Sequence, residues 1–478
     1  MELILIFAVI IVSAIACLMS KNRIVMEASS VIASLVAFFG SMVIAMKVAT
    51  VGSYSQWSFF SVDALGAIIM MIVAFVGLAA TIYSVRYLRE ETSKEIIGYK
   101  EVKQYFILLN LFLGAMFLAS TSSSPIFTWI AIEATTLSTA FLISFYNKPT
   151  AMEAAWKYLI INSVGLLLAF FGTLLYFTSF QIGAEAVTWT TLLSNAVNLD
   201  PTIAKMAFVF VLVGYGTKVG LAPMHTWLPD AHSKAPVPIS ALLSGVLLNV
   251  AFIAVLRFKA VTDLAVGSEF SQKLLMAFGL LSVLIAVFII FGQKNYKRLL
   301  AYSSIENMGI IALGFGFGGL GVFAAIFHLI YHSLIKSALF LSVGNIFLKY
   351  SSTKIINVRG VITALPVTGV LFLTGFFAIT GTPPFGIFLT KIFIISAGIQ
   401  AHPFLGVTTI LLTAILFVGF FKHVVAMTFG AKPAEIKTGE ISVWLILPPL
   451  VLLTVALTLS FYVPQFLLTL INTVVSQY

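Results

Sequence analysis

The sequence predicts an all-α membrane protein that crosses the bilayer about fourteen times, and its composition carries most of that prediction. Of the 478 residues, 60% are apolar and 9% are charged, whereas soluble domains carry about 25% charged residues. The mean hydropathy is +1.09, and apolar runs long enough to span a bilayer recur along the chain. These features exclude a water-soluble enzyme, a nucleic-acid-binding protein and a disordered protein.

The apolar runs divide into expected spans, several of which are so long that they must tilt, break or protrude. No basic residue precedes the first run, so we interpret it as an uncleaved helix. The fourteen expected spans are 2–18, 25–46, 61–84, 105–123, 126–145, 153–178, 204–224, 237–257, 274–291, 299–317, 321–348, 362–397, 403–428 and 441–472.

Lysine and arginine set the expected orientation. The loops that follow odd-numbered spans hold eighteen of these residues, and the other loops hold five. By the positive-inside rule the odd loops face the cytoplasm, so both termini face outward across a plasma membrane. The net charge of +10 then lies mainly on the inner face, where it suits anionic lipid headgroups and does not indicate nucleic acid.

When Lys205, Arg257 and Lys422, which lie within two turns of the ends of their spans, are counted with the adjoining loops, four of the 27 basic residues remain inside expected spans. A charged side chain at mid-bilayer costs about 2.5–3.5 kcal/mol on insertion scales. Lysines kept at that cost require ion pairs, a water-filled pathway or a proton relay. The four residues are Lys157, Lys218, Lys336 and Lys391.

Lys218 lies about fourteen residues into the seventh span, too deep to reach the interface easily. The segment around it is rich in helix-breaking residues, so the helix is expected to break and to expose carbonyl groups that favour a cation. We interpret Lys218 as a titrating group, because a buried lysine releases its proton when its counter-charge withdraws. A single structural salt bridge is the alternative. The breakers are Gly214, Gly216, Gly220, Pro223 and Pro229.

Glu133 is the acidic residue within the fifth span, which makes it the natural partner of Lys218. Sequence alone does not show that the two touch. The alternative is a neutral carboxyl group hydrogen-bonded to Thr135 or Thr136.

His328, His332 and Lys336 are spaced at i, i+4 and i+8, so they share one face of the eleventh span. Two histidines in register with a mid-membrane lysine favour a proton relay. A metal site would need Glu306 or His225 from another segment, and we expect none.

The twelfth span repeats the pattern of the seventh, because a cluster of glycines and prolines precedes Lys391. Two broken helices with one lysine each, five spans apart, indicate an inverted repeat within a single membrane domain, 1–478. The expected parts are an N-terminal unit, a first repeat, a second repeat and a last helix, at 1–100, 104–260, 272–430 and 441–478.

Other polar residues have two interpretations. Lys157 lies one turn into its span and can reach the headgroups. Glu306 can line a water-filled entrance or hydrogen-bond a loop. Asp63 is typical of a helix cap, and His225 and His232 flank the break and can be structural.

The chain lacks the motifs of redox and nucleotide chemistry. One cysteine, Cys17, excludes an internal disulfide, a thiolate-bound iron–sulfur cluster and a C-x-x-C pair. No Walker A motif or strand-linked G-x-G-x-x-G motif is present. We therefore expect the chain itself to bind no cofactor.

The motifs together resemble the antiporter-like membrane subunits of respiratory complex I, Mrp-type cation/proton antiporters and group 4 energy-converting hydrogenases, and most closely the F-type subunits of hydrogenase-4 and formate hydrogenlyase complexes. The likeness covers most of the chain and is strongest from Asp63 to Lys391. It is carried by Ile132-Glu133-Ala134, Thr217-Lys218-Val219, Pro223 to His232, Lys297 to Ser304, His328 to Lys336 and Gly381 to Phe385.

This resemblance implies two inverted five-helix repeats, broken helices 7 and 12, and a line of charged residues and water along the membrane mid-plane. In such a line Glu133 pairs with Lys218, the His328–Lys336 face forms the central relay, and Lys391 serves the second half-channel. Asn249 departs from relatives that carry lysine or histidine there, which weakens a protonated step at that point.

Three functions are consistent with these residues. The first is a proton-translocating, non-redox subunit of a redox-driven complex, with other membrane subunits and a peripheral iron–sulfur arm as partners. The second is a subunit of a cation/proton antiporter without redox partners. The third is a passive scaffold whose buried charges only specify packing.

Overall fold

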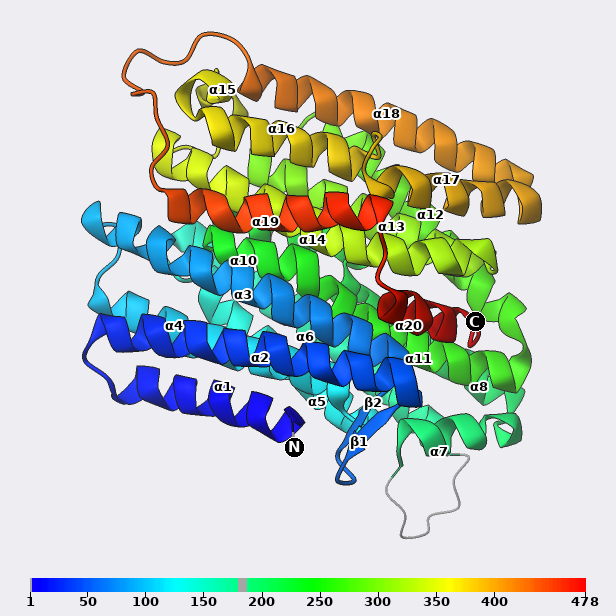
Figure 1. The fold of residues 1–478 in the computed structure, drawn as a ribbon. Coiled ribbons are helices and arrows are strands. Elements are labelled where there is room, and N and C mark those ends of the chain that lie inside the picture. The colour runs from blue at the N-terminus through cyan, green and yellow to red at the C-terminus, as the bar shows by residue number, and fades with distance from the viewer. Residues whose placement is uncertain (1, 179–186) are drawn as a thin grey trace.

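The computed structural model describes residues 2–178 and 187–478, and nearly all of them are helical. Within these ranges thirteen helices, counted through short breaks, are long and apolar enough to cross a membrane. Two shorter helices, α16 and α17, follow one another and supply a fourteenth crossing. Figure 1 shows most of these helices packed side by side along one common direction. The predicted all-α, fourteen-span architecture is confirmed.

The N-terminal unit also contains a short antiparallel hairpin in which Tyr54 lies opposite Val62. The elements are α1 (Glu2–Met19), α2 (Arg23–Val51), β1 (Tyr54–Gln56), β2 (Phe60–Val62), α3 (Ala64–Ser93), α4 (Tyr99–Thr121), α5 (Pro125–Ile143), α6 (Pro149–Phe177), α7 (Trp189–Ser194), α8 (Pro201–Val219), α9 (Trp227–Lys234), α10 (Val237–Leu242), α11 (Leu248–Val266), α12 (Ser268–Ile290), α13 (Tyr296–Phe317), α14 (Leu320–Tyr350), α15 (Val361–Ala364), α16 (Pro366–Thr380), α17 (Gly386–Ala401), α18 (Pro403–Thr428), α19 (Val443–Phe461) and α20 (Gln465–Val475).

Both expected helix breaks are present, and each begins at a glycine with a left-handed backbone. Helix α8 ends at Gly220 with φ of +81°, and α16 ends at Gly381 with φ of +87°. Glycine adopts this conformation without the steric cost that a β-carbon would add. The breaks therefore separate α8 from α9 and α16 from α17, as predicted.

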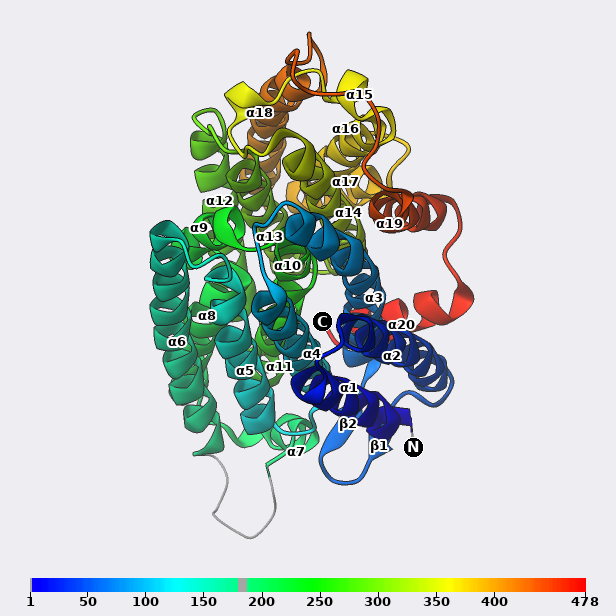
Figure 2. The same cartoon turned by 90° about the vertical axis from the view of Figure 1, so that its left-hand side faces the viewer.

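The last expected span, 441–472, is divided in the structure. Helix α19 ends at Phe461, and Pro464 immediately precedes α20. Proline restricts the residue before it to an extended conformation, which ends the first helix. The apolar face of α20 packs against α2, α3 and α14, and Figure 2 shows α20 turned away from the line of α19.

Helix α19 reaches the break in the twelfth crossing. The Ser460 hydroxyl accepts a hydrogen bond from the Gly386 N–H at 2.8 Å, which caps the first turn of α17. A β-carbon on Gly386 would lie 2.5 Å from the Tyr331 hydroxyl, so this position has room only for glycine. The three helices α14, α17 and α19 therefore meet at one point.

The two termini lie on one side of the bundle, and the α1–α2, α3–α4 and α18–α19 connections lie on the opposite side (Figure 1). An even number of crossings requires the two termini to share a side. The lysine-rich connections are thus separated from the termini by the membrane-spanning layer.

Helices α6 and α8 approach closely because glycines line their contact. A β-carbon on Gly214 would lie 2.6 Å from both the Gly165 carbonyl oxygen and the Ala169 β-carbon. Neither the backbone nor an alanine side chain can rotate away from such a contact. The approach brings the end of α8, with Lys218, against the polar face of α6.

We predict that Gly214→Ala destabilises the protein by about 1–3 kcal/mol, the usual cost of overpacking a tight interior. Thermal unfolding of the detergent-solubilised protein measures the effect. Gly292→Ala is the matched control, because the nearest atom to a β-carbon there is 3.9 Å away. Equal melting temperatures for the two variants would contradict the close-packing argument.

Candidate functional site

Lys218 lies in the last turn of α8, and its side chain is fully buried. Its Nζ donates hydrogen bonds to Thr136 Oγ1 at 2.8 Å and to the Tyr158 hydroxyl at 2.6 Å. The ammonium group also lies 4.7 Å from the centre of the Tyr158 ring, within cation–π range. Hydroxyl groups and an aromatic face therefore surround Lys218 in this state.

Glu133 faces the same region from α5 but bonds to a different helix. Its Oε1 accepts a hydrogen bond from Ser163 of α6 at 2.8 Å, and its Oε2 has no partner. Among the described residues, no carboxylate oxygen comes within ion-pair distance of Lys218. The expected Glu133–Lys218 ion pair is thus open here, with Thr136 one turn along α5 between them.

Lys391, in the second half, forms a closed ion pair. Its Nζ lies 2.8 Å from Oε1 of Glu306, and both side chains are buried. The other oxygen of Glu306 contacts the Asn307 amide. Burying two charges is favourable only when they pair and their remaining polar atoms are satisfied. Glu306, which the sequence left open, is therefore a mid-membrane carboxylate like Glu133.

His328 connects α14 to both neighbouring helices. Its Nε2 donates to Asn307 Oδ1 at 3.0 Å, because an amide oxygen can only accept, and its Nδ1 lies 2.9 Å from Thr390 Oγ1. Asn307 is adjacent to Glu306 on α13, and Thr390 is adjacent to Lys391 on α17. The histidine therefore bridges the two helices that carry the closed ion pair.

Lys336 continues this network towards the first half. Its Nζ donates to the Leu300 carbonyl at 2.7 Å and also contacts the Ser303 hydroxyl. The Ser303 carbonyl accepts from Asn307 at 2.6 Å, which joins Lys336 to the His328 group. His332 is fully buried between them, and neither of its ring nitrogens has a protein partner.

The two halves meet at Asn249 of α11. Its amide nitrogen donates to the Ser333 hydroxyl of α14 at 2.6 Å, while its side-chain oxygen has no partner. Nearby, the Ser244 and Ser304 hydroxyls lie 2.7 Å apart. Neutral side chains therefore occupy the junction, as expected from the asparagine at this position in the sequence.

The remaining candidate residues lie outside the buried array or beside the first helix break. The Lys157 side chain is 49% exposed and pairs with Glu153 at 2.6 Å, so it lies outside the buried array. Asp63 accepts from the Gly66 N–H at 2.6 Å and caps α3. His225 and His232 are both buried beside the α8–α9 break.

Sequence reasoning missed several buried charges, three of which lie where a helix extends beyond its expected span. Lys259 is fully buried and pairs with Asp263 near the end of α11. The Lys297 Nζ, in the first turn of α13, donates to the Ala235 carbonyl at 2.6 Å. Glu91 is fully buried near the end of α3. Of these three residues, only Lys259 had a signal in the sequence: Asp263 follows it at i+4, the spacing of an ion pair on one face of a helix.

No three histidine, cysteine, aspartate or glutamate side chains gather into a metal-binding group within residues 2–178 and 187–478. The buried array instead consists of lysines, carboxylates, histidines and hydroxyls from several helices. Such groups exchange protons, and at this depth they cannot exchange them directly with bulk water.

Residues 122–417 match the family model "NADH:quinone oxidoreductase/Mrp antiporter, TM". That range covers more than half of the sequence and contains every residue of the buried array. The chain belongs to this antiporter-like membrane family. Residues 49–95 also match the N-terminal model of complex I chain 5.

Curated relatives of this antiporter-like protein include hydrogenase components. It is 38% identical over 412 residues to the hydrogenase-4 component F homolog of Methylacidiphilum infernorum. The match covers 85% of this chain and 84% of that protein. It is 29% identical to hydrogenase-4 component B of Escherichia coli, covering 69% of this chain but only 49% of that longer protein.

Solved structures confirm the fold of the antiporter-like protein. A chain of the membrane-bound sulfane sulfur reductase, an archaeal respiratory complex, matches 99% of the protein with a TM-score of 0.87 and 22% identity. A chain of the Mrp complex from Dietzia gives 0.86, with 19% identity over 99% of this chain and 96% of that one. A chain of Thermus thermophilus respiratory complex I gives 0.77, with 20% identity over 96% of this chain and 97% of that one.

We predict that Glu306→Gln destabilises the antiporter-like protein by about 3–5 kcal/mol, because it leaves the Lys391 charge buried without its partner. Denaturation of the detergent-solubilised protein with SDS measures the loss. Glu269→Gln is the control: its pair with Lys273 is exposed, and exposed pairs contribute at most about 1 kcal/mol. A Glu306→Gln variant as stable as Glu269→Gln would show that the buried pair contributes no net stability.

Proposed function

We propose that this chain is the proton-translocating membrane subunit of a redox-driven respiratory or hydrogenase-type complex. The observation that carries the proposal is the buried array itself. A buried lysine lies beside each helix break, and hydrogen-bonding side chains of α13, α14 and α17 join Lys336, His328 and the Lys391–Glu306 pair. Its relay residues are Glu133, Lys218, His328, His332, Lys336 and Lys391, with Glu306 as the partner of Lys391.

The two lysine–carboxylate sites differ in a way that suits a relay. In the second half the Lys391–Glu306 pair is closed at 2.8 Å. In the first half Lys218 bonds to hydroxyl groups, and Glu133 bonds to Ser163 instead. A lysine holds its proton while its carboxylate is close and releases it when the carboxylate withdraws. One open and one closed pair are therefore two stages of the same cycle.

The free energy of opening or closing one buried pair is large enough to move a proton against a membrane potential. Moving one charge against 100 mV costs about 2.3 kcal/mol. Separating a buried charge from its partner changes the free energy by about 3–5 kcal/mol. Opening or closing one pair can therefore drive one proton step, provided that a redox event elsewhere in the complex supplies the displacement.

The relatives support a proposal for the partners, and the distribution of lysine and arginine supports one for the orientation. Because the chain is similar to a hydrogenase-4 component F homolog over most of both lengths, we propose neighbouring membrane subunits and a peripheral iron–sulfur arm, with no redox cofactor on this chain. We place the protein in the plasma membrane. The lysine-rich connections then face the cytoplasm and both termini face outward.

The alternative is a cation/proton antiporter component without redox partners. It is favoured by 27% identity over 84% of this chain to an Na(+)/H(+) antiporter subunit from Alkalihalophilus pseudofirmus, although the match covers only 52% of that relative. The two functions share the same relay. They differ in the co-purifying proteins and in a requirement for sodium.

We predict that Lys218→Ala abolishes proton transport while the complex still assembles, because the relay loses its lysine at the first break. Dye-quenching in sealed vesicles measures the transport, with Lys157→Ala as the control because that exposed lysine lies outside the array. A passive scaffold would instead show altered assembly and unchanged transport per assembled complex.

Affinity purification in mild detergent separates the two transport functions. A redox-driven pump is expected to bring with it a nickel–iron or iron–sulfur protein and to transport protons without sodium. Purification with small membrane proteins alone, together with sodium-dependent transport, would replace the proposal by the antiporter alternative.

A further inference from the structure

A buried carboxylate lies near the end of α3, outside the array described above. Glu91 has no exposed surface, and its Oε1 accepts a hydrogen bond from the Tyr146 hydroxyl at 2.6 Å. Its Oε2 is also buried and has no partner. A buried carboxylate normally collects several hydrogen bonds or a counter-ion. Glu91 instead keeps one oxygen free, which calls for an explanation beyond packing.

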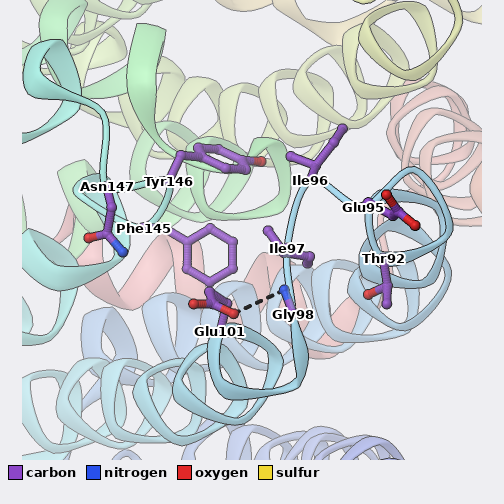
Figure 3. Close-up of a pocket in the computed structure, with 9 residues that line it drawn as sticks. All are labelled: Thr92, Glu95, Ile96, Ile97, Gly98, Glu101, Phe145, Tyr146 and Asn147. Carbon is purple, nitrogen blue, oxygen red and sulfur yellow. Dashed lines mark hydrogen bonds between the residues drawn. The ribbon is translucent and has the colours of Figure 1, made fainter.

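Tyr146 separates two cavities on this side of the bundle. The larger, of about 400 Å³, lies between the α3–α4 connection and the end of α5, where Phe145 and Tyr146 face Ile96 and Ile97 (Figure 3). The smaller, of about 170 Å³, is lined by Tyr87, Tyr146 and Lys297 among others. Each is far larger than the roughly 10–15 Å³ that one water molecule needs. Water can therefore reach both faces of Tyr146.

Lys297 connects the smaller cavity to the central array. Its Nζ is held by the Ala235 carbonyl at 2.6 Å, and its side chain lines the cavity. Leu300, one turn further along α13, provides the carbonyl that accepts from Lys336. Lys297 therefore lies one helical turn, about 4.5 Å of rise, from the point where α13 holds the relay lysine.

His232 adds a second connection between the same groups. It precedes Ala235 by three residues on α9, and its ring stacks on Phe340 of α14, with centroids 4.9 Å apart. Phe340 is one turn beyond Lys336. Both ring nitrogens of His232 are buried and have no partner. An imidazole with free nitrogens thus lies between Lys297 and Lys336.

The charged and titratable groups around Glu91 come from every element packed against it. No basic group lies within ion-pair distance of Glu91 among the described residues, and the Lys94 Nζ contacts the Leu348 carbonyl instead. The facing groups are Tyr83, Tyr87 and Lys94 on α3, Tyr105 on α4, Tyr146 after α5, and Lys297 on α13.

We infer that Glu91 is a proton-loading site that takes protons from water on the lysine-rich side and passes them to Lys297. The inference rests on the proposed function. A proton from water in the larger cavity enters through the Tyr146 hydroxyl, which lines both cavities. The hydroxyl donates its own proton to Oε1 of Glu91 and takes one from water, and Glu91 becomes a neutral carboxyl group. Once Lys297 has given its own proton to the relay, the proton of Glu91 moves through the tyrosine hydroxyls and water in the smaller cavity to the Lys297 amine. Glu91 returns to the carboxylate, and Lys297 supplies the relay at Lys336.

The test replaces the carboxylate while preserving its shape. We expect Glu91→Gln to slow proton transport by the assembled complex about 100-fold, since a positioned proton-transfer group contributes roughly 10²–10⁴-fold to its step. The defect should deepen as the pH on the lysine-rich side rises, because free protons become scarce there. Glu95→Gln is the control, because Glu95 lines the larger cavity together with Tyr146 but is exposed.

Infrared difference spectra give a readout that a purely structural role would not change. Wild-type and Glu95→Gln complexes should share a carbonyl band of a protonated carboxyl group that titrates with pH, and Glu91→Gln should lack it. If Glu91→Gln does not assemble, Glu91→Asp should restore both assembly and the band, and Tyr146→Phe should slow transport without removing the band.

Transport by assembled Glu91→Gln at the wild-type rate across the pH range would overturn the inference, as would an unchanged band. Either result leaves the proposed function intact, because wild-type transport and its loss in Lys218→Ala are measured in the same vesicles. A wild-type complex that transports no protons would instead overturn the proposed function.

Discussion

The cost of placing charge in hydrocarbon is the constraint on which the rest of this structure depends. Each buried lysine of the array must find oxygen atoms that make up for lost water. Lys391 finds a carboxylate, Lys218 finds two hydroxyl groups and an aromatic ring, and Lys336 finds a backbone carbonyl and a serine. The helix breaks, the glycine contacts and the polar faces of α5, α6 and α13 are arranged to supply those atoms.

The arrangement gives the three lysines different partners although their side chains are identical. A carboxylate partner favours the charged form strongly, whereas hydroxyls and carbonyls favour it less. A small rotation of Glu133 from Ser163 towards Lys218 would exchange one environment for the other. Neutral residues hold these side chains in their present positions: Ser163 bonds to Glu133, Thr136 to Lys218 and Asn307 to His328.

Much of the fold could be predicted because it depends on local patterns. Apolar runs gave the crossings, and glycines and prolines located the breaks at Gly220 and Gly381. The Lys391–Glu306 pair could not be predicted, because it depends on how α13 packs against α17, which periodicity does not encode. The open Glu133–Lys218 site differs from the expected contact for the same reason. The sequence places Lys297 in a loop, because the expected apolar span begins at residue 299. In the structure α13 begins three residues earlier and includes Lys297.

The hydrogen bond from Gly386 to Ser460 has a consequence for how the chain is made. Synthesis proceeds from the N-terminus, so α17 leaves the ribosome well before α19. Until α19 is inserted, the Gly386 N–H at the start of α17 lacks this acceptor, and an unsatisfied polar group in the membrane interior costs several kcal/mol. The first turn of α17, five residues before Lys391, therefore gains its cap only from a helix that is made later.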